Sequence, residues 1–189
     1  MSIFEYVMVL LSVVLGLALT QLLINLADLL RAGERVRWSL TYATWMLLTL
    51  ALVLDMWTSL WLLHEQPRWN IGVLVFVLFQ CSSIFLLAHL MTPHGTGEGG
   101  TDLWEFHLAN RRLYLAPVIA YDLAGIVMNL LVLPASALVS LSTWMFVVPV
   151  TILLMLAWWL PWTWLQRAAT GAMLLAMLTY FAFFFSSIG

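Results

Sequence analysis

The stretch IGVLVFVLFQCSSIFLLAHLM, residues 71–91, carries no aspartate, glutamate, lysine or arginine. A helix of about 20 apolar residues crosses the hydrocarbon core of a bilayer. Five more segments are predominantly apolar, and the six predicted spans are 3–30, 38–63, 71–91, 113–131, 135–160 and 163–185. The sequence therefore predicts an all-α integral membrane protein in which residues 1–189 form a single polytopic domain, one bundle of six transmembrane helices.

The composition of the whole chain excludes a soluble fold. Of its 189 residues, 64% are hydrophobic and 8% are charged, and the mean hydropathy is +1.02. An ordinary soluble domain carries about 25% charged residues. With seven arginines and no lysine, the chain has no basic patch that could neutralise phosphates, so a nucleic-acid partner is excluded. Cys81 is the only cysteine, which rules out an intramolecular disulfide and a cysteine-based zinc site.

The placement of arginine predicts how the bundle is oriented. Six of the seven arginines lie in or beside the connections that follow the first, third and fifth spans, whereas the opposite side has only Arg68. Connections rich in arginine stay in the cytoplasm. We therefore expect a multi-pass protein of a bacterial-type inner membrane, with both termini outside. The arginines expected in the cytoplasm are Arg31, Arg35, Arg37, Arg111, Arg112 and Arg167.

The connection at residues 93–112 contains its own helix signal. Asp102 is followed three residues later by Glu105, the spacing of a capping box, so a short cytoplasmic amphipathic helix is expected to begin near Leu103, before the fourth span. This segment supplies an alternative function, in which a non-catalytic membrane subunit or sensor docks a partner protein. The docking surface would consist of Trp104, Phe106, Arg111 and Arg112.

Two carboxyl groups fall at membrane depth. Asp122 lies near the middle of the fourth span and Asp55 lies in the outer half of the second, and no arginine shares the depth of either. Charged side chains are costly in hydrocarbon and usually face the interior of a bundle, where they mark ion pathways and proton relays. Without a cationic partner, desolvation favours the neutral acid. Gln80, near the middle of the third span, can accept a hydrogen bond from such a carboxyl group.

Polar residues spread through the bundle give the first functional hypothesis, a channel or transporter component coupled to protons or to a cation. Asp122 would be the proton or cation site, and Gln80 and Asp55 would assist. The alternative is a set of isolated interhelical hydrogen bonds, each worth about 0.6–2 kcal/mol, and Asp28 also has Arg31 within salt-bridge reach. Ordered by depth, the predicted pathway is Asp28, Asn25, Gln21, Gln80, Asp122, Asn129, Asp55 and Glu5.

Other chemistries have no signature in this sequence. There is no phosphate-binding glycine loop with lysine, no HExxH and no GxSxG motif. The spacings of His89, His94 and His107 match no compact metal site, and His64 and His89 lie on opposite sides of the predicted membrane, too far apart to hold one haem iron. The sequence favours a protein without metal, cofactor or enzymatic activity. A redox or quinone-binding subunit is a weaker alternative, and a chain of this size is compatible with a homo-oligomer or with a place in a membrane complex.

Overall fold

The computed structural model describes residues 3–62, 71–93, 100–132 and 141–188. Six α-helices occupy most of this part of the chain: α1 (Ile3–Ala32), α2 (Leu40–Leu62), α3 (Ile71–Leu90), α4 (Leu103–Val132), α6 (Leu141–Trp159) and α7 (Thr163–Ile188). Each overlaps one of the six apolar segments of the sequence, and the prediction of an all-helical protein is confirmed. The short elements are η1 (Gly33–Arg35), β1 (Val36–Arg37) and β2 (Thr101–Asp102).

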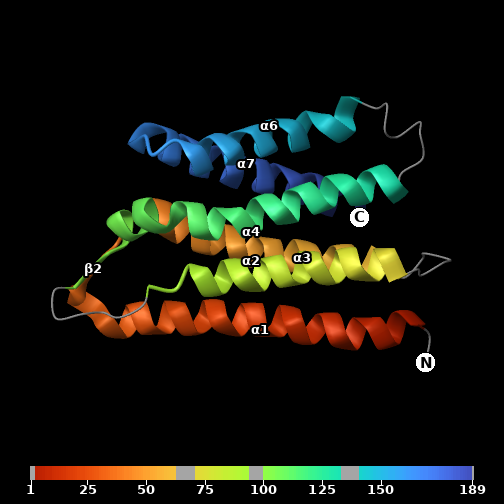
Figure 1. Cartoon of the computed structure of the whole chain (residues 1–189), viewed down its shortest axis with the longest axis horizontal. Coiled ribbons are helices and arrows are strands. Elements are labelled where there is room, and N and C mark those ends of the chain that lie inside the picture. Colours follow the sequence, from red (N-terminus) through yellow and green to blue (C-terminus); the bar gives the residue numbers. More distant parts are fainter. Residues whose placement is uncertain (1–2, 63–70, 94–99, 133–140, 189) are drawn as a thin grey trace.

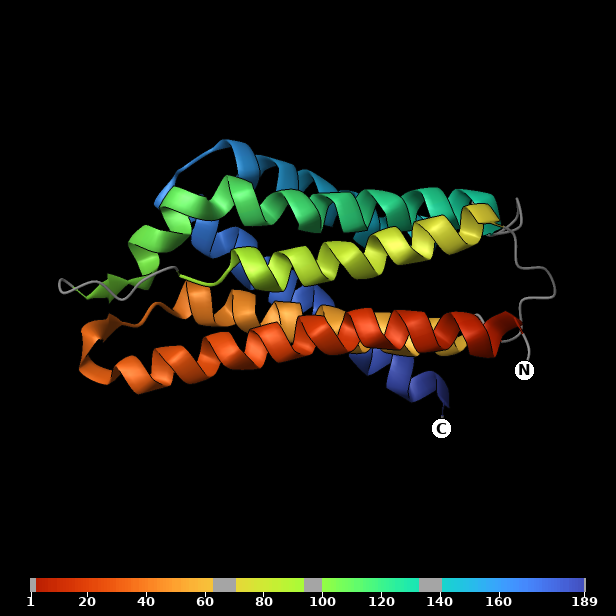
Figure 2. The same ribbon diagram turned by 60° about the horizontal axis from the view of Figure 1, so that its bottom comes forward.

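The helices lie side by side and form an elongated bundle (Figure 1). Helix α1 packs against α2 and α3, α3 packs against α4, and α6 and α7 pack against α4 and α2 respectively. Successive helices alternate in direction, so the ends of α1 and α7 that are nearest the termini lie at the same end of the bundle (Figure 2). Apolar side chains are buried in two clusters, one around Trp45 and Tyr114 and the other around Leu11 and Leu60.

Three helical segments of the described chain are long and apolar enough to cross a membrane. They are Glu5–Arg35, Leu40–Leu60 and Ile71–Leu90. The apolar stretch Val147–Trp159 of α6 is shorter than this requirement. A helix needs about 20 residues to span a bilayer. The three segments that meet the criteria of length and hydropathy all lie in the first half of the chain.

Helix α4 corrects one prediction. A short amphipathic helix separate from the fourth span is expected from the sequence, and this is wrong, because one continuous helix runs from Leu103 to Val132. Asp102 caps that helix as predicted: its Oδ1 accepts hydrogen bonds from the backbone N–H groups of Trp104, at 2.9 Å, and Glu105, at 3.2 Å. No glycine or proline occurs in residues 103–116, so the polar first turns continue directly into the apolar remainder.

Two very short strands join the connection after α1 to the connection before α4. Strand β1 pairs with β2 in parallel, which sets Arg37 opposite Asp102, and the Arg37 guanidinium lies 3.5 Å from the Asp102 carboxylate. Gly100, at φ +79°, approaches Arg35 so closely that a Cβ there would lie 2.7 Å from the Arg35 carbonyl oxygen. Strands of two residues show no alternation of apolar and polar side chains, so the sequence gives no sign of this pairing.

Candidate functional site

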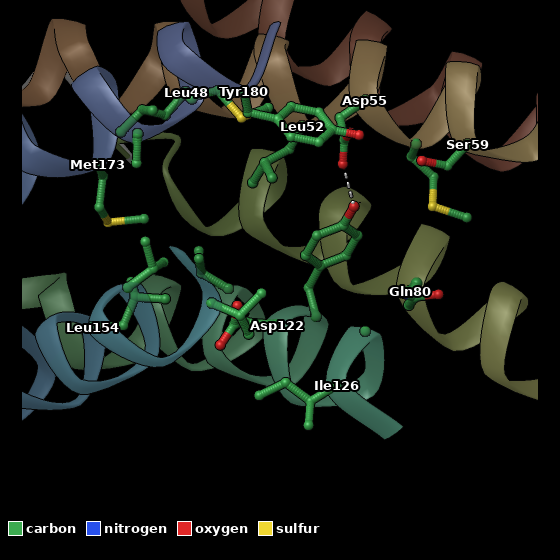
Figure 3. A pocket seen from close by; sticks show the side chains of 18 of the residues that line it. Leu48, Leu52, Asp55, Ser59, Gln80, Asp122, Ile126, Leu154, Met173 and Tyr180 are labelled. Atoms are coloured by element: carbon green, nitrogen blue, oxygen red, sulfur yellow. Dashed lines mark hydrogen bonds between the residues drawn. The ribbon is translucent and has the colours of Figure 1, made fainter. Parts of the chain in front are cut away.

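A cavity of about 470 Å³ lies between α2, α3, α4, α6 and α7. Most of its wall is made of leucine, valine, isoleucine and methionine side chains. Figure 3 shows Asp55, Gln80 and Asp122 on different helices around this space. These are the residues that the sequence ranks first as a proton or cation site, and the fold brings all three to one cavity. The polar and aromatic lining residues are Trp45, Asp55, Ser59, Gln80, Tyr121, Asp122 and Tyr180.

Asp55 of α2 is held by two tyrosines. The Tyr121 hydroxyl of α4 donates a hydrogen bond of 2.9 Å to Asp55 Oδ2, drawn as a dashed line in Figure 3. Tyr180 of α7 also hydrogen-bonds the Asp55 side chain. Both hydroxyls can donate to an ionised carboxylate, and neither brings a charge of its own. The carboxyl group is therefore fixed where three helices meet.

Asp122 of α4 contacts Thr151 of α6. Thr151 Oγ1 lies 2.5 Å from Asp122 Oδ2 and 2.8 Å from the carbonyl oxygen of Val147. A threonine hydroxyl has one hydrogen to donate. The hydroxyl either shares its hydrogen between the two oxygens, or donates to Val147 and accepts a hydrogen bond from a protonated Asp122. This geometry accommodates a carboxyl group that holds a proton.

Two further polar side chains reach the cavity from α2 and α3. Gln80 is buried, and a Cβ on Gly125 of α4 would be in ordinary contact with its Nε2, at 3.6 Å. Trp45 is 1% exposed, and its indole N–H has no hydrogen-bond partner within the described part of the chain. Buried donors are nearly always paired in folded proteins. The Trp45 N–H is therefore a free donor in a residue that lines the cavity.

The only charges that the described lining residues can bring to the cavity are negative. Two carboxyl groups line it, whereas its described lining residues include no arginine and no histidine. Electrostatic interactions are strong in such apolar surroundings. Carboxyl groups in such a cavity can bind a proton or pair with a cation, and they oppose the entry of an anion.

Other members of the predicted pathway lie elsewhere. Gln21 Nε2 of α1 donates to Thr92 Oγ1 at 3.2 Å, and Asn25 Nδ2 donates to the Tyr42 hydroxyl at 2.9 Å. These bonds connect α1 with α2 and with the end of α3, and neither amide lines the cavity. Asp28 is exposed and lies 3.4 Å from Arg31, as the spacing predicts. The fold thus separates this group from Asp55 and Asp122.

The last two members of the predicted pathway are Asn129 and Glu5. Asn129 belongs to α4, but its side chain lies outside the described residues. Glu5 is exposed near the start of α1. Of the eight residues in the predicted pathway, the cavity therefore collects Gln80, Asp55 and Asp122.

His107 of α4 is the centre of a second buried polar group. The Tyr114 hydroxyl hydrogen-bonds its Nδ1, and Gln166 Oε1 of α7 lies 3.2 Å from its Nε2. Gln166 Nε2 donates to the carbonyl oxygens of Ala157, at 2.6 Å, and Leu160, at 2.8 Å. Because the amide nitrogen is used in this way, the amide oxygen accepts from Nε2–H of a neutral imidazole, and Nδ1 accepts from the tyrosine. Burial lowers the pKa of His107 to about 4.

The residues predicted to dock a partner make contacts within the chain. The Trp104 ring stacks on His107, with centroids 5.6 Å apart, and the Arg167 guanidinium lies 5.0 Å from the same Trp104 ring. Phe106 packs edge-on against Tyr42. These contacts hold the start of α4 against α2 and α7.

The two arginines of that predicted surface are also engaged. Arg111 Nη1 donates to the carbonyl oxygen of Leu108 at 2.6 Å. The Arg112 guanidinium lies 5.6 Å from the Trp158 ring, whose indole N–H donates to the Arg112 carbonyl oxygen at 2.9 Å. Arg112 thus joins α4 to the end of α6, whereas Arg111 bonds within α4.

Sequence reasoning missed the hydroxyl groups that contact the carboxyls. Tyr121 immediately precedes Asp122 yet bonds Asp55 on another helix, while Thr151 and Tyr180 come from the two last helices. Tyrosine and threonine are common in apolar helices, so composition does not single them out. A tyrosine next to an aspartate in an apolar segment is the one signal that the sequence offers.

No protein-family model, no curated protein and no solved structure matches this chain. What the cavity can do therefore follows from the chemistry of its own residues.

Proposed function

We propose that this chain is an integral membrane protein of six transmembrane helices that moves protons, or a cation in exchange for protons, across the bilayer. Asp55 and Asp122 are the exchanging groups, and Gln80 assists them. The observation that carries the proposal is that all three side chains line one cavity without a basic residue among its described walls. Intramembrane acids in such a setting typically belong to ion or proton pathways.

The surface of the bundle supports a membrane location. Large apolar side chains point outward along the helices: Val13 is 56% exposed, Leu17 is 53% exposed and Ile71 is 77% exposed. Monomeric soluble proteins rarely expose contiguous apolar surface on this scale, whereas lipid tails solvate it. In the proposed orientation the arginine-rich end faces the cytoplasm of a bacterial-type inner membrane, and both termini face outward.

The contacts of the two acids support proton exchange. Asp122 is placed to hold a proton against Thr151, and Asp55 is placed to accept hydrogen bonds from Tyr121 and Tyr180. Both carboxyl groups are half-buried between helices, which favours a bound proton, and both have hydroxyl neighbours that stabilise the charged form. Each group can therefore bind a proton and release it.

Proteoliposomes test this proposal. An imposed potassium diffusion potential should drive proton uptake if the protein conducts protons alone, and an outward gradient of the exchanged cation should drive it if the protein exchanges cations for protons. A trapped pH-sensitive dye records the uptake in both cases. We expect Asp122→Asn and Asp55→Asn each to reduce the uptake rate at least about tenfold, because neither amide can bind and release the proton. Asp28→Asn is the matched control: it makes the same change on the exposed face of α1 and should leave uptake unchanged. Equal rates in all four proteins, or no uptake in the unmodified protein, would overturn the proposal.

A further inference from the structure

We propose that the cation exchanged for protons in this cavity is a hydrophobic organic cation, such as an aromatic or alkyl ammonium ion. This inference rests on the proposed function, because it names the substrate class of the same site. It is carried by the juxtaposition of Asp55 and Asp122 with apolar and aromatic walls around one space (Figure 3).

The cavity is too large and too apolar for an inorganic cation. Its volume of about 470 Å³ falls within the range of about 300–1,000 Å³ that small-molecule sites occupy. Ca²⁺ requires about six to eight oxygen ligands, and Mg²⁺ keeps several waters, whereas carbon and sulfur atoms form most of these walls. Methionine side chains adapt to ligands of different shape, and four of them line the space: Met56, Met128, Met173 and Met177. An apolar body fits here.

The charges of the cavity select the sign of the ligand. Asp55 and Asp122 supply two acidic groups, and the described lining residues supply no base to offset them. The rings of Trp45, Tyr121 and Tyr180 belong to the same lining, and aromatic faces attract ammonium ions. A hydrophobic anion of the same size would meet the carboxyl groups without any compensating donor of positive charge.

Binding of the cation would release a proton. In the proposed exchange, Asp122 without a bound cation holds a proton, and its 2.5 Å contact with the Thr151 hydroxyl accommodates this protonated form. When an ammonium ion enters, this carboxyl group gives its proton to water that leaves the cavity, and the resulting carboxylate pairs with the ammonium nitrogen. The net charge of the occupied cavity is then the same as that of the empty cavity, and the ammonium ion enters together with a carboxylate that pairs with it. One proton leaves for each cation that binds.

Tetraphenylphosphonium and tetraphenylborate provide a matched pair of probes, because they share shape and size and differ in the sign of their charge. Equilibrium dialysis with the full chain in detergent should show binding of tetraphenylphosphonium and none of tetraphenylborate, and a dye in weak buffer should record proton release on binding. We expect Asp122→Asn to weaken binding at least about tenfold and to abolish the proton release. Asp122→Glu keeps a carboxyl group and should retain both, while Asp28→Asn should match the unmodified protein.

Each outcome bears on one proposal. Binding of both probes, or of neither, would overturn the inference, and so would binding that Asp122→Glu and Asp122→Asn weaken equally. If tetraphenylphosphonium does not bind while potential-driven proton uptake persists, the substrate class is wrong and the proposed function stands. If tetraphenylphosphonium binds and releases a proton but proteoliposomes show no proton uptake under either the potential or the outward cation gradient, the site is correct and the transport function is wrong.

Discussion

At the scale of single residues, His107 shows how a polar side chain can serve the fold. It is 0% exposed. One ring nitrogen pairs with Tyr114, about two helical turns further along α4, and the other pairs with Gln166 on α7. The same glutamine binds two carbonyl groups at the end of α6. Unsatisfied carbonyl groups at a helix end need partners of this kind. One histidine thus helps to hold three helices together.

This burial makes stability depend on pH in a defined direction. The folded protein keeps His107 neutral down to its pKa of about 4, whereas the unfolded chain protonates it near 6.5. Stability should therefore fall as pH decreases from 6.5 to 4, by about 3 kcal/mol from this group, and then level off. Thermal unfolding in detergent between pH 7.5 and 4 should show a steeper loss for the unmodified protein than for His107→Gln. Equal pH dependence in the two proteins would contradict the assignment.

The cost of burying charge made part of the site predictable. Asp55, Gln80 and Asp122 stand out because polar groups at membrane depth need an explanation, and the fold places them at one cavity. Gln21 and Asn25 stand out for the same reason but belong to another cluster. Depth along a helix follows from residue numbers, whereas the identity of the neighbouring helix depends on packing. Sequence alone therefore cannot separate the two groups.

At the scale of elements, the positions of the helices follow from apolar length and the exceptions follow from local chemistry. Each of the six helices overlaps a segment that hydropathy and chain breakers define. Helix α4 differs because no glycine or proline lies between Leu103 and Ala116, where polar composition changes to apolar, and the helix continues through Pro117. The pairing of β1 with β2 is a contact between residues 65 positions apart in its register, Arg37 and Asp102, and no local pattern encodes it.

Gly100 allows a direct test of that pairing. In Gly100→Ala the new Cβ would meet the Arg35 carbonyl oxygen at 2.7 Å, and the φ of +79° would be strained as well. Gly33→Ala is the matched control, because its φ of +53° carries the strain but nothing lies within 4 Å of the new atom. We expect a loss of about 1 kcal/mol for Gly33→Ala and a larger loss, about 2–3 kcal/mol, for Gly100→Ala. Thermal unfolding in detergent measures both, and equal losses would show that the close approach is unimportant.

At the scale of the whole molecule, the arginines of the described residues gather at the end of the bundle that holds the β1–β2 pair. Arg37 pairs with Asp102 there, Arg112 lies over Trp158, and Arg167 lies over Trp104. These contacts combine positive charge with aromatic rings that suit the boundary between lipid and water. The opposite end of the described bundle contains the start of α1 and the end of α7 (Figure 2). The proposed orientation follows from this asymmetry.

Cysteine labelling tests the orientation and the membrane location together. Cys81 is 0% exposed and should not react with a membrane-impermeant maleimide, so single cysteines can be added to the natural chain. Glu34→Cys, in the exposed turn η1, should be labelled in spheroplasts only after the membrane is permeabilised, because the arginine-rich end faces the cytoplasm. Glu5→Cys, at the opposite end of α1, should be labelled without permeabilisation. The reverse pattern would invert the proposed orientation, and labelling of both cysteines in a soluble fraction would remove the membrane from the proposal.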